Sequence, residues 1–161
     1  MLKDPECLAR YEQSLAATTA DALDSLPTEP SRENVLALQA HLATLPQLDL
    51  PPKHHFAPGM YGRELFIPAD SVVVGKIHRH QHITILMAGE CTINTNNGME
   101  RIVGPHVWIS QVDAKRALYT HSDCVFFTCH TNANDETDLD KLEFEIIEPE
   151  NIVLTYESEG E

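Results

Sequence analysis

Three histidines recur at alternate positions in one short segment of the chain. His78, His80 and His82 stand at the start of an apolar run that continues to Met87. Successive side chains of a β-strand point to opposite faces, so a strand through this segment would place the three imidazoles on one face. Neutral imidazole is the commonest protein ligand for zinc, iron, nickel and copper. The spacing predicts a divalent metal site; the alternative is a row of histidines on the solvent face of an edge strand.

Short apolar runs separated by turn residues dominate the chain from Tyr61 onward. Turn signals such as Asn96-Asn97-Gly98 divide them. Regular short strands of this kind predict a mainly β fold, a sandwich or a barrel. The expected strands cover residues 63–67, 71–77, 82–87, 91–95, 101–103, 107–111, 116–120 and 124–130.

The segment before these strands has helical character. Residues 4–25 are rich in alanine and leucine and end just before Pro27, which predicts a helix. Ser31 is a plausible N-cap of a second helix, whose apolar stripe consists of Val35, Leu38, Leu42 and Leu45. The stripe must be buried, either on the protein's own barrel or on a partner. We therefore expect a homodimer or docking through the N-terminal helices as one possibility.

Proline content and acidity divide the chain into three regions. Four prolines between residues 46 and 58 predict an extended linker over 46–60. Asp138 can cap a brief helix, and the segment from Thr131 to Glu161 carries eleven acidic residues against one base, Lys141. We expect a helical extension with the start of the linker over 1–50, a barrel over 51–147 and an acidic tail over 148–161.

The overall charge and the cysteines exclude several classes of function. A net charge of −14 with only 11 lysines and arginines argues against nucleic acid as a partner. We expect no membrane attachment, because no apolar stretch approaches the ~20 residues that span a bilayer. The four cysteines form no Cys-x-x-Cys pair and follow no secretory signal, which favours the reducing cytoplasm.

Residues 61–130 resemble a cupin, a small jelly-roll family whose barrel usually holds one divalent metal. The first cupin motif reads Gly, five residues, His-x-His, three or four residues, Glu, six residues, Gly. Gly89-Glu90 resembles the end of this motif, and counting back from Gly89 places His82 at the acidic position. The segment is two or three residues shorter than the usual motif. The resemblance implies a single cupin-type barrel with an N-terminal helical extension, holding iron, zinc, manganese or nickel.

The second cupin motif has its counterpart at residues 111–116. Arg116 stands where the resemblance places the third metal histidine. A guanidinium cannot bind a cation, but it can hold a carboxylate or phosphate with two hydrogen bonds. Either another ligand replaces that histidine or the pocket binds an anion. His130 is the natural replacement, because the last strand alternates Phe126, Thr128 and His130 on one face; the alternative is a surface histidine at the end of a strand.

Three further residues complete the predicted site. Glu64, in the first barrel strand, could orient an imidazole, ligate the metal or move a proton as the catalytic residue; the alternative is an exposed carboxylate paired with a base. Tyr119 is a candidate substrate contact, although an aromatic side chain in a barrel strand is more often part of the core. His55 is a candidate substrate contact at the rim, and a position in a packed linker is its alternative.

A wider pattern over roughly residues 45–145 is similar to small uncharacterised cupins encoded by bacteriophages. The pattern includes the segment 54–59, Tyr61-x-Arg63-Glu64 and Thr128-x-His130. The resemblance implies a phage origin, a place in the host cytoplasm or the virion, and phage proteins as partners. It supplies no substrate.

Two functions follow as hypotheses. The first is a metal-dependent enzyme, a dioxygenase, isomerase or hydrolase, acting on a small anionic molecule. The second is a non-catalytic jelly roll that sequesters a small ligand or takes part in virion assembly, because the fold alone does not decide function.

Overall fold

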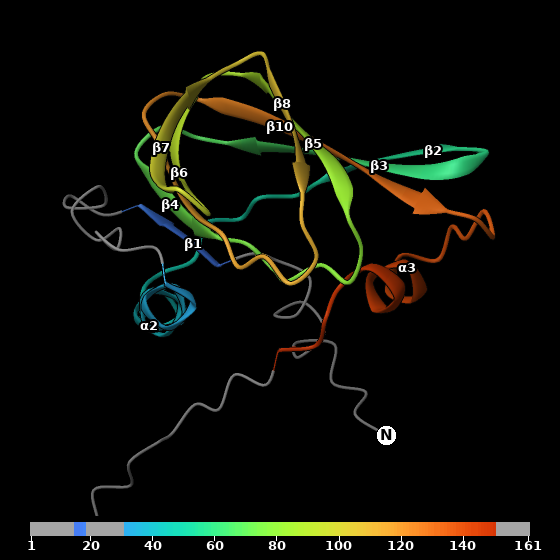
Figure 1. Cartoon of the computed structure of the whole chain (residues 1–161), viewed down its shortest axis with the longest axis horizontal. Coiled ribbons are helices and arrows are strands. Elements are labelled where there is room, and N and C mark those ends of the chain that lie inside the picture. Colours follow the sequence, from blue (N-terminus) through green and yellow to red (C-terminus); the bar gives the residue numbers. More distant parts are fainter. Residues whose placement is uncertain (1–14, 19–30, 151–161) are drawn as a thin grey trace, which may run out of the picture.

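Two antiparallel sheets of five strands each form the body of the protein. The computed structural model describes residues 15–18 and 31–150 (Figure 1). Sheet A has the strand order β1-β4-β9-β6-β7, and sheet B has the order β2-β3-β10-β5-β8. The strands are β1 Leu15–Thr18, β2 Lys53–Ala57, β3 Gly59–Ile67, β4 Ser71–Val74, β5 His82–Ala88, β6 Glu90–Thr95, β7 Gly98–Val103, β8 His106–Ser110, β9 Ala117–Thr120 and β10 Cys124–Asn132; the helices are α2 Arg32–Leu42 and α3 Leu139–Ile146.

The order in which the chain visits the sheets makes this fold a jelly roll. After β3 in sheet B the chain crosses to β4 in sheet A and returns to β5. It then forms the β6–β7 hairpin in sheet A, crosses to β8, and alternates again through β9 and β10. This repeated crossing curls both sheets around one core, as in the cupin type of jelly roll. The expectation of a mainly β, cupin-type barrel with a helix before it is confirmed.

One tight turn depends on a glycine. Gly89 joins β5 to β6 at a φ of +95°, which side chains other than glycine rarely adopt. A Cβ at this position would also overlap the backbone carbonyl of Asp123. This close approach brings the start of β10 against the β5–β6 turn, next to the register shift between Val125 and Phe126 where β10 pairs with β5.

The barrel interior is apolar at its centre. Leu86 of β5 and Phe126 of β10 are register partners, and both are buried. Val73 of β4 and Cys91 of β6 meet them from sheet A. At roughly 25 cal/mol per Å² of buried apolar surface, such a contiguous cluster is the main source of stability in a domain of this size.

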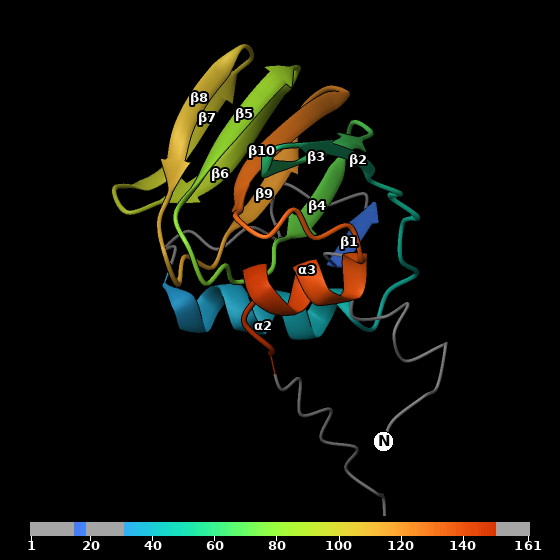
Figure 2. The same cartoon turned by 90° about the vertical axis from the view of Figure 1, so that its right-hand side faces the viewer.

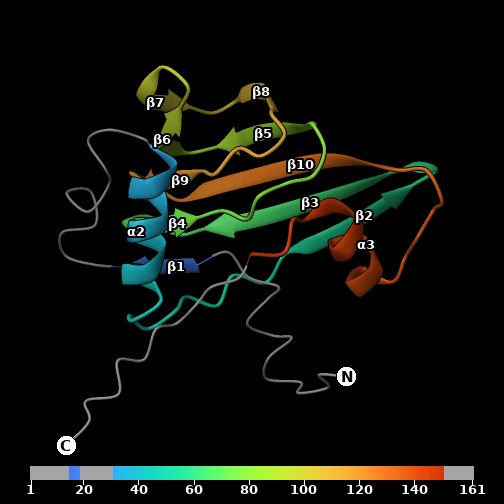
Figure 3. The same ribbon diagram turned by 60° about the horizontal axis from the view of Figure 1, so that its bottom comes forward.

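Helix α2 packs on the outer face of sheet A. Ser31 caps it, its side chain accepting a hydrogen bond from the backbone N–H of Asn34 at 3.1 Å, as predicted. Val35 and Leu42 are fully buried in a cluster with Leu38 and with residues of β4 and β9. Figure 3 shows α2 across the ends of β1, β4 and β9. The apolar stripe is therefore buried on the protein's own barrel.

Three predicted elements differ from the structure. Residues 15–18, expected to be helical, form the edge strand β1, because pairing with β4 outweighs a local helical preference. The remainder of the expected helix over 4–25 and the acidic tail from residue 151 lie outside the described residues. The expected linker over 46–60 contains β2, which fits between the prolines because residues 53–57 include none.

The third difference concerns the strand expected over 71–77. The strand ends at Val74, and residues 75–81 are loop with one isolated bridge at His78. This loop carries the chain from sheet A across to β5 in sheet B. It also carries two of the histidines on which the metal prediction was based.

The outer face of sheet B is apolar and open. Ile83 of β5 and Ile109 of β8 are register partners there, and Ile85 and Val107 follow in the next pair. Ile83, Val107 and Ile109 are about half exposed, as are Met87 and Phe66 on the same sheet. None of the helices in the described parts of the chain is long and apolar enough to cross a membrane.

Candidate metal centre

Three histidines converge at one end of the barrel. One ring nitrogen each of His78, His82 and His130 lies within 4.8 Å of the others. His82 is the first residue of β5, His130 lies near the end of β10, and His78 comes from the loop before β5. The ligand atoms of tetrahedral zinc lie about 3.3 Å apart, as Zn–N bonds of about 2.0–2.1 Å require. Small side-chain rotations would bring the three nitrogens to that spacing, so the donor set fits a divalent metal.

His80, the fourth predicted ligand, lies outside this cluster. Residues 79 and 80 form a bend, so the alternation expected of a continuous strand is broken and the His80 side chain is exposed. Its backbone carbonyl instead lies 3.3 Å from Nδ1 of His82. The prediction that the three alternate imidazoles share one face was wrong, because residues 75–81 form a loop between sheet A and sheet B and not a continuous strand.

Each histidine ring of the cluster also lies beside a backbone or hydroxyl group that orients the ring. The His80 carbonyl is placed to accept from Nδ1 of His82, which leaves Nε2 free as a ligand. The ring of His78 is hydrogen-bonded to the backbone of Lys76. Nε2 of His130 lies 3.1 Å from the Thr128 hydroxyl. Such outer partners fix the tautomer and orientation of a metal-binding imidazole.

Burial keeps the three imidazoles neutral at pH 7. Desolvation, and then the charges of His82 and His130, lower the pKa of His78 to about 2. Desolvation, followed by the charges of His82 and Arg63, lowers the pKa of His130 to about 3. The pKa of His82 is lowered as well, chiefly by desolvation. Neutral imidazole is the form that ligates a metal, so the cluster needs no proton loss to bind one.

Helix α3 holds His78 in place from outside the sheets. His78 forms an isolated antiparallel bridge with Ile147, the residue that ends α3. The next residue, Arg79, donates its backbone N–H to the carbonyl of Ile146 at 2.8 Å and its Nε to that of Ile147 at 2.9 Å. Lys76 and Glu143 form an ion pair between the loop and the helix. The loop that carries His78 is thus attached to α3 rather than to a strand.

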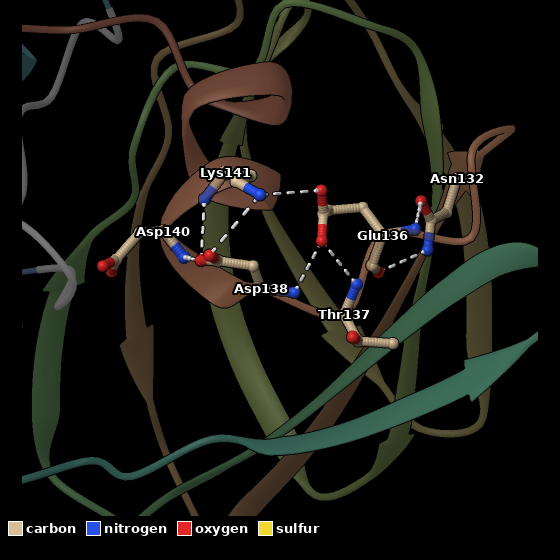
Figure 4. Close-up of polar contacts among 6 residues, drawn as sticks. All are labelled: Asn132, Glu136, Thr137, Asp138, Asp140 and Lys141. Atoms are coloured by element: carbon tan, nitrogen blue, oxygen red, sulfur yellow. Dashed lines mark hydrogen bonds and ion pairs between the residues drawn. The ribbon is translucent and has the colours of Figure 1, made fainter.

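A capping network begins α3 directly after β10 (Figure 4). The Asp138 carboxylate accepts from the backbone N–H groups of Asp140 at 3.1 Å and Lys141 at 3.4 Å. The buried side chain of Asn132 bonds both the N–H and the carbonyl of Glu136, each at 2.9 Å. Asp138 was predicted as the cap, and the structure confirms it.

Apolar packing seats α3 against the barrel. Leu142 and Ile146 are buried in a cluster with Tyr61 of β3. Both helices lie below the barrel in Figure 2, and Figure 3 shows α3 near β3. The Tyr61 ring also stacks on the ring of His130, with centroids 6.0 Å apart. One aromatic side chain therefore contacts both the helix and the histidine cluster.

The barrel wall becomes polar toward the histidines. Inward residues of β10 run from Phe126 through Thr128 to His130, and those of β5 run from Leu86 through Thr84 to His82. Thr84 and Ser110 exchange a hydrogen bond of 2.8 Å between hydroxyls. The inward residues of β3 likewise change from Leu65 to Arg63 and Tyr61. The cluster is consequently lined by hydroxyl groups and one guanidinium.

Glu64, the predicted catalytic residue, is on the other face of its strand. It pairs with Phe127 in register, whereas His130 pairs with Tyr61, so Glu64 faces outward. Its carboxylate binds Lys53 at 2.9 Å and His55 at 3.2 Å, and these bonds lower its pKa. His55, predicted at the substrate rim, is half exposed on the same outer face. Neither residue joins the histidine cluster.

Arg63 is the site residue that sequence reasoning missed. Arg63 is part of the wider sequence pattern, but the sequence alone favours its neighbour Glu64 for the chemical role. A signal was present in the alternation of β3: Arg63 shares its face with Leu65 and Ile67, which pack in the core, and adjacent residues of a strand face opposite sides. The residue on the core face, not the acid beside it, was the better candidate.

Arg116 and Tyr119 lie in the region of sheet A, away from the histidines. Arg116 lines an open cavity of about 430 Å³ with Arg32, Lys115 and residues of the β6–β7 turn, and its guanidinium donates to the Asn94 carbonyl at 2.9 Å. Tyr119 packs beside the α2 cluster, and its hydroxyl donates to Asp70 at 2.7 Å. No histidine lines that cavity.

Comparisons with known proteins return structural likenesses alone. No protein-family model matches the sequence, and no curated protein matches it. An acetylacetone dioxygenase from Acinetobacter johnsonii matches with a TM-score of 0.43 and 14% identity over 51% of this chain and 59% of that chain. This chain thus spans less than two thirds of that enzyme. A cupin-2 domain protein from Shewanella frigidimarina matches with a TM-score of 0.43 and 8% identity, covering 57% and 89%.

An ectoine synthase from P. lautus matches with a TM-score of 0.46 and 13% identity over 54% of this chain and 67% of that one. The strand order itself establishes the fold of the present chain. The described residues combine a cupin-type jelly roll with a cluster of His78, His82 and His130 that is compatible with binding a divalent metal.

Proposed function

We propose that this protein is a metal-dependent enzyme that holds one divalent ion through His78, His82 and His130. The observation that carries the proposal is the convergence of three buried ring nitrogens within 4.8 Å, from one loop and two strands. His130 is distant in the sequence from His78 and His82, so folding is needed to bring the three ligands together. The hydroxyl-lined wall beside them supplies the polar groups that orient a small molecule.

Three protein ligands leave coordination positions open for water or a substrate. Zinc or manganese would supply Lewis-acid chemistry or an activated water there, whereas iron would supply dioxygen chemistry. The chain's own contribution is to orient the three rings through the His80 and Lys76 backbone groups and the Thr128 hydroxyl. The identity of the ion and the reaction, whether oxygenation, isomerisation or hydrolysis, belong to the proposal.

Elemental analysis of protein purified without chelator or tag tests the metal site directly. We expect close to one ion of iron, zinc, manganese or nickel per chain, lost in His82→Ala and His130→Ala. His80→Ala is the matched control, because this exposed histidine lies two residues from both His78 and His82 and should keep the ion. Unchanged metal content in His82→Ala, or loss in His80→Ala, would contradict the proposed ligand set.

A second candidate function is a non-catalytic jelly roll that takes part in assembly. The open apolar outer face of sheet B favours it, since soluble monomers rarely expose contiguous apolar patches of more than a few hundred Å². A phage protein would use such a face in the virion or in the host cytoplasm. Light scattering of the purified protein, together with a search for it in phage particles, tests this candidate. A monomer that is absent from particles would exclude it.

A further inference from the structure

The guanidinium of Arg63 is a mostly buried cation, and the described residues provide no hydrogen-bond or ion-pair partner for it. No hydrogen bond or ion pair joins it to any residue within 15–18 or 31–150. The hydroxyl of neighbouring Tyr61 lies 2.7 Å from Nδ1 of His54. The nearby acid Glu143 is already paired with Lys76. Among the described residues, Arg63 therefore faces the barrel interior without a carboxylate bound to it.

A buried cation without an anion is costly, and the same chain shows how such a charge is normally compensated. The other buried base, Lys115, is 6% exposed and binds both carboxylate oxygens of Glu150 at 2.7 Å. Its ammonium also donates to the carbonyl of Gly75 at 2.9 Å. An uncompensated buried charge lowers stability by several kcal/mol in typical proteins. Within residues 31–150, Arg63 thus differs from Lys115 in having no carboxylate bound to it.

The position of Arg63 places that missing anion beside the histidine cluster. Arg63 is the register partner of Thr128, and His130 is two residues further along β10 on the same inward face. The electrostatic effect of Arg63 extends to both His78 and His130. A small molecule that reaches the three ring nitrogens with one end can therefore reach the guanidinium with the other.

We propose that Arg63 binds the carboxylate of a small organic acid whose other end occupies the open side of the three-histidine centre. The inference rests on the proposed metal site and names the substrate class of that site. A guanidinium presents a planar pair of donors that matches the two coplanar oxygens of a carboxylate. A single cation among neutral hydroxyls matches a single negative charge, whereas the doubly charged phosphate needs more cations than this wall supplies.

The anion-binding role thus belongs to Arg63 and not to Arg116, the residue expected from the sequence. Arg116 was predicted to clamp the anion, but it lies in the cavity near sheet A with two other bases and no histidine. Arg63→Met and Arg116→Met are therefore a matched pair. Both remove a partly or mostly buried guanidinium and keep the length of an unbranched side chain.

Acetate, its neutral analogue acetamide and inorganic phosphate are the probes. Calorimetric titration of the metal-loaded full chain gives the affinity for each, and metal content is measured on every sample. We expect acetate to bind and to raise the melting temperature, and acetamide to do neither. Arg63→Met should weaken acetate binding at least tenfold with unchanged metal content, Arg63→Lys by less, and Arg116→Met by no more than twofold.

The opposite results would overturn the inference. Equal acetate affinity in Arg63→Met, equal binding of acetamide, tighter binding of phosphate, or loss of binding in Arg116→Met would each do so. Without added anion, Arg63→Met should leave the melting temperature unchanged or raise it. A clear fall would mean that a carboxylate outside the described residues pairs with Arg63. If the wild-type protein holds no metal, the proposed function fails, and acetate titration of the metal-free protein still decides the role of Arg63.

Discussion

Replacing Leu142 with alanine is expected to weaken the metal site from outside it. Leu142 is 2% exposed and packs with Ile146 and Tyr61 where α3 meets the barrel. His78 is bonded to the end of the same helix through its bridge with Ile147. A helix that docks less firmly should therefore release the loop that carries one ligand, although no ligand has been changed.

The size of the effect follows from the atoms removed. Leucine to alanine deletes three carbon groups, and at about 0.8 kcal/mol for each the transfer term is about 2.4 kcal/mol. The cluster is small and lies at the barrel mouth, so the cavity term should be modest and the total about 2–3 kcal/mol, the lower part of the usual range. If the whole loss falls on docking of α3, metal affinity falls by up to roughly 140-fold, at 1.4 kcal/mol per tenfold.

Urea unfolding and competition with a metal-binding dye measure the two quantities. Leu139→Ala is the control, because this leucine of the same helix is 40% exposed and should lose less than about 1 kcal/mol. The reasoning is refuted if Leu142→Ala loses stability while its metal affinity equals that of the control. That result would mean that His78 keeps its place without α3.

Two further predictions concern the capping network and the buried imidazoles. Asp138→Ala should lower the free energy of unfolding by about 1 kcal/mol, because it leaves backbone N–H groups of α3 unpaired. The control Asp140→Ala should lower it by less than half of that amount. A larger loss in Asp140→Ala than in Asp138→Ala, measured by urea unfolding, would contradict the cap. For the metal-free protein, the unfolded chain binds protons below pH 6.5 that His78, with its pKa of about 2, and His130, with its pKa of about 3, do not bind when folded. The contribution of the two neutral histidines to the free energy of unfolding is therefore fully present above pH 6.5. It falls by about 2 kcal/mol per histidine by pH 5. Equal free energies of unfolding at pH 7 and pH 5 would refute this prediction.

The elements that sequence reasoning identified are those with strong local signals. The strands from Arg63 to His130 have alternating apolar residues and turn residues between them, and the helix after Ser31 has a cap and a stripe. The strand β1 has no such signal, because it forms by pairing with β4, which is distant in sequence. Local preference cannot reveal a pairing of that kind.

The candidate site was predictable in part for the same reason. The presence of histidines showed that metal chemistry was plausible, and the alternation of β10 pointed to His130. The bend that excludes His80 depends on how the chain crosses between the sheets, and the support of His78 by α3 joins residues almost 70 positions apart. The alternation of β3 places Arg63 on the inward face and Glu64 on the outward face, although glutamate is the more familiar catalytic residue type.

The attachment of His78 to α3 sets the order of events during synthesis. The chain must extend through Ile147 before the loop of residues 75–81 can take its final path, because the bridge partner of His78 follows β10 and α3 in the sequence. Contacts of such long sequence separation form late, since loop closure precedes any gain from the contact. A nascent chain that ends before α3 therefore presents His82 and His130 without His78. With the proposed ligand set, a truncated product with an almost complete barrel should therefore retain the ion less well than the finished fold.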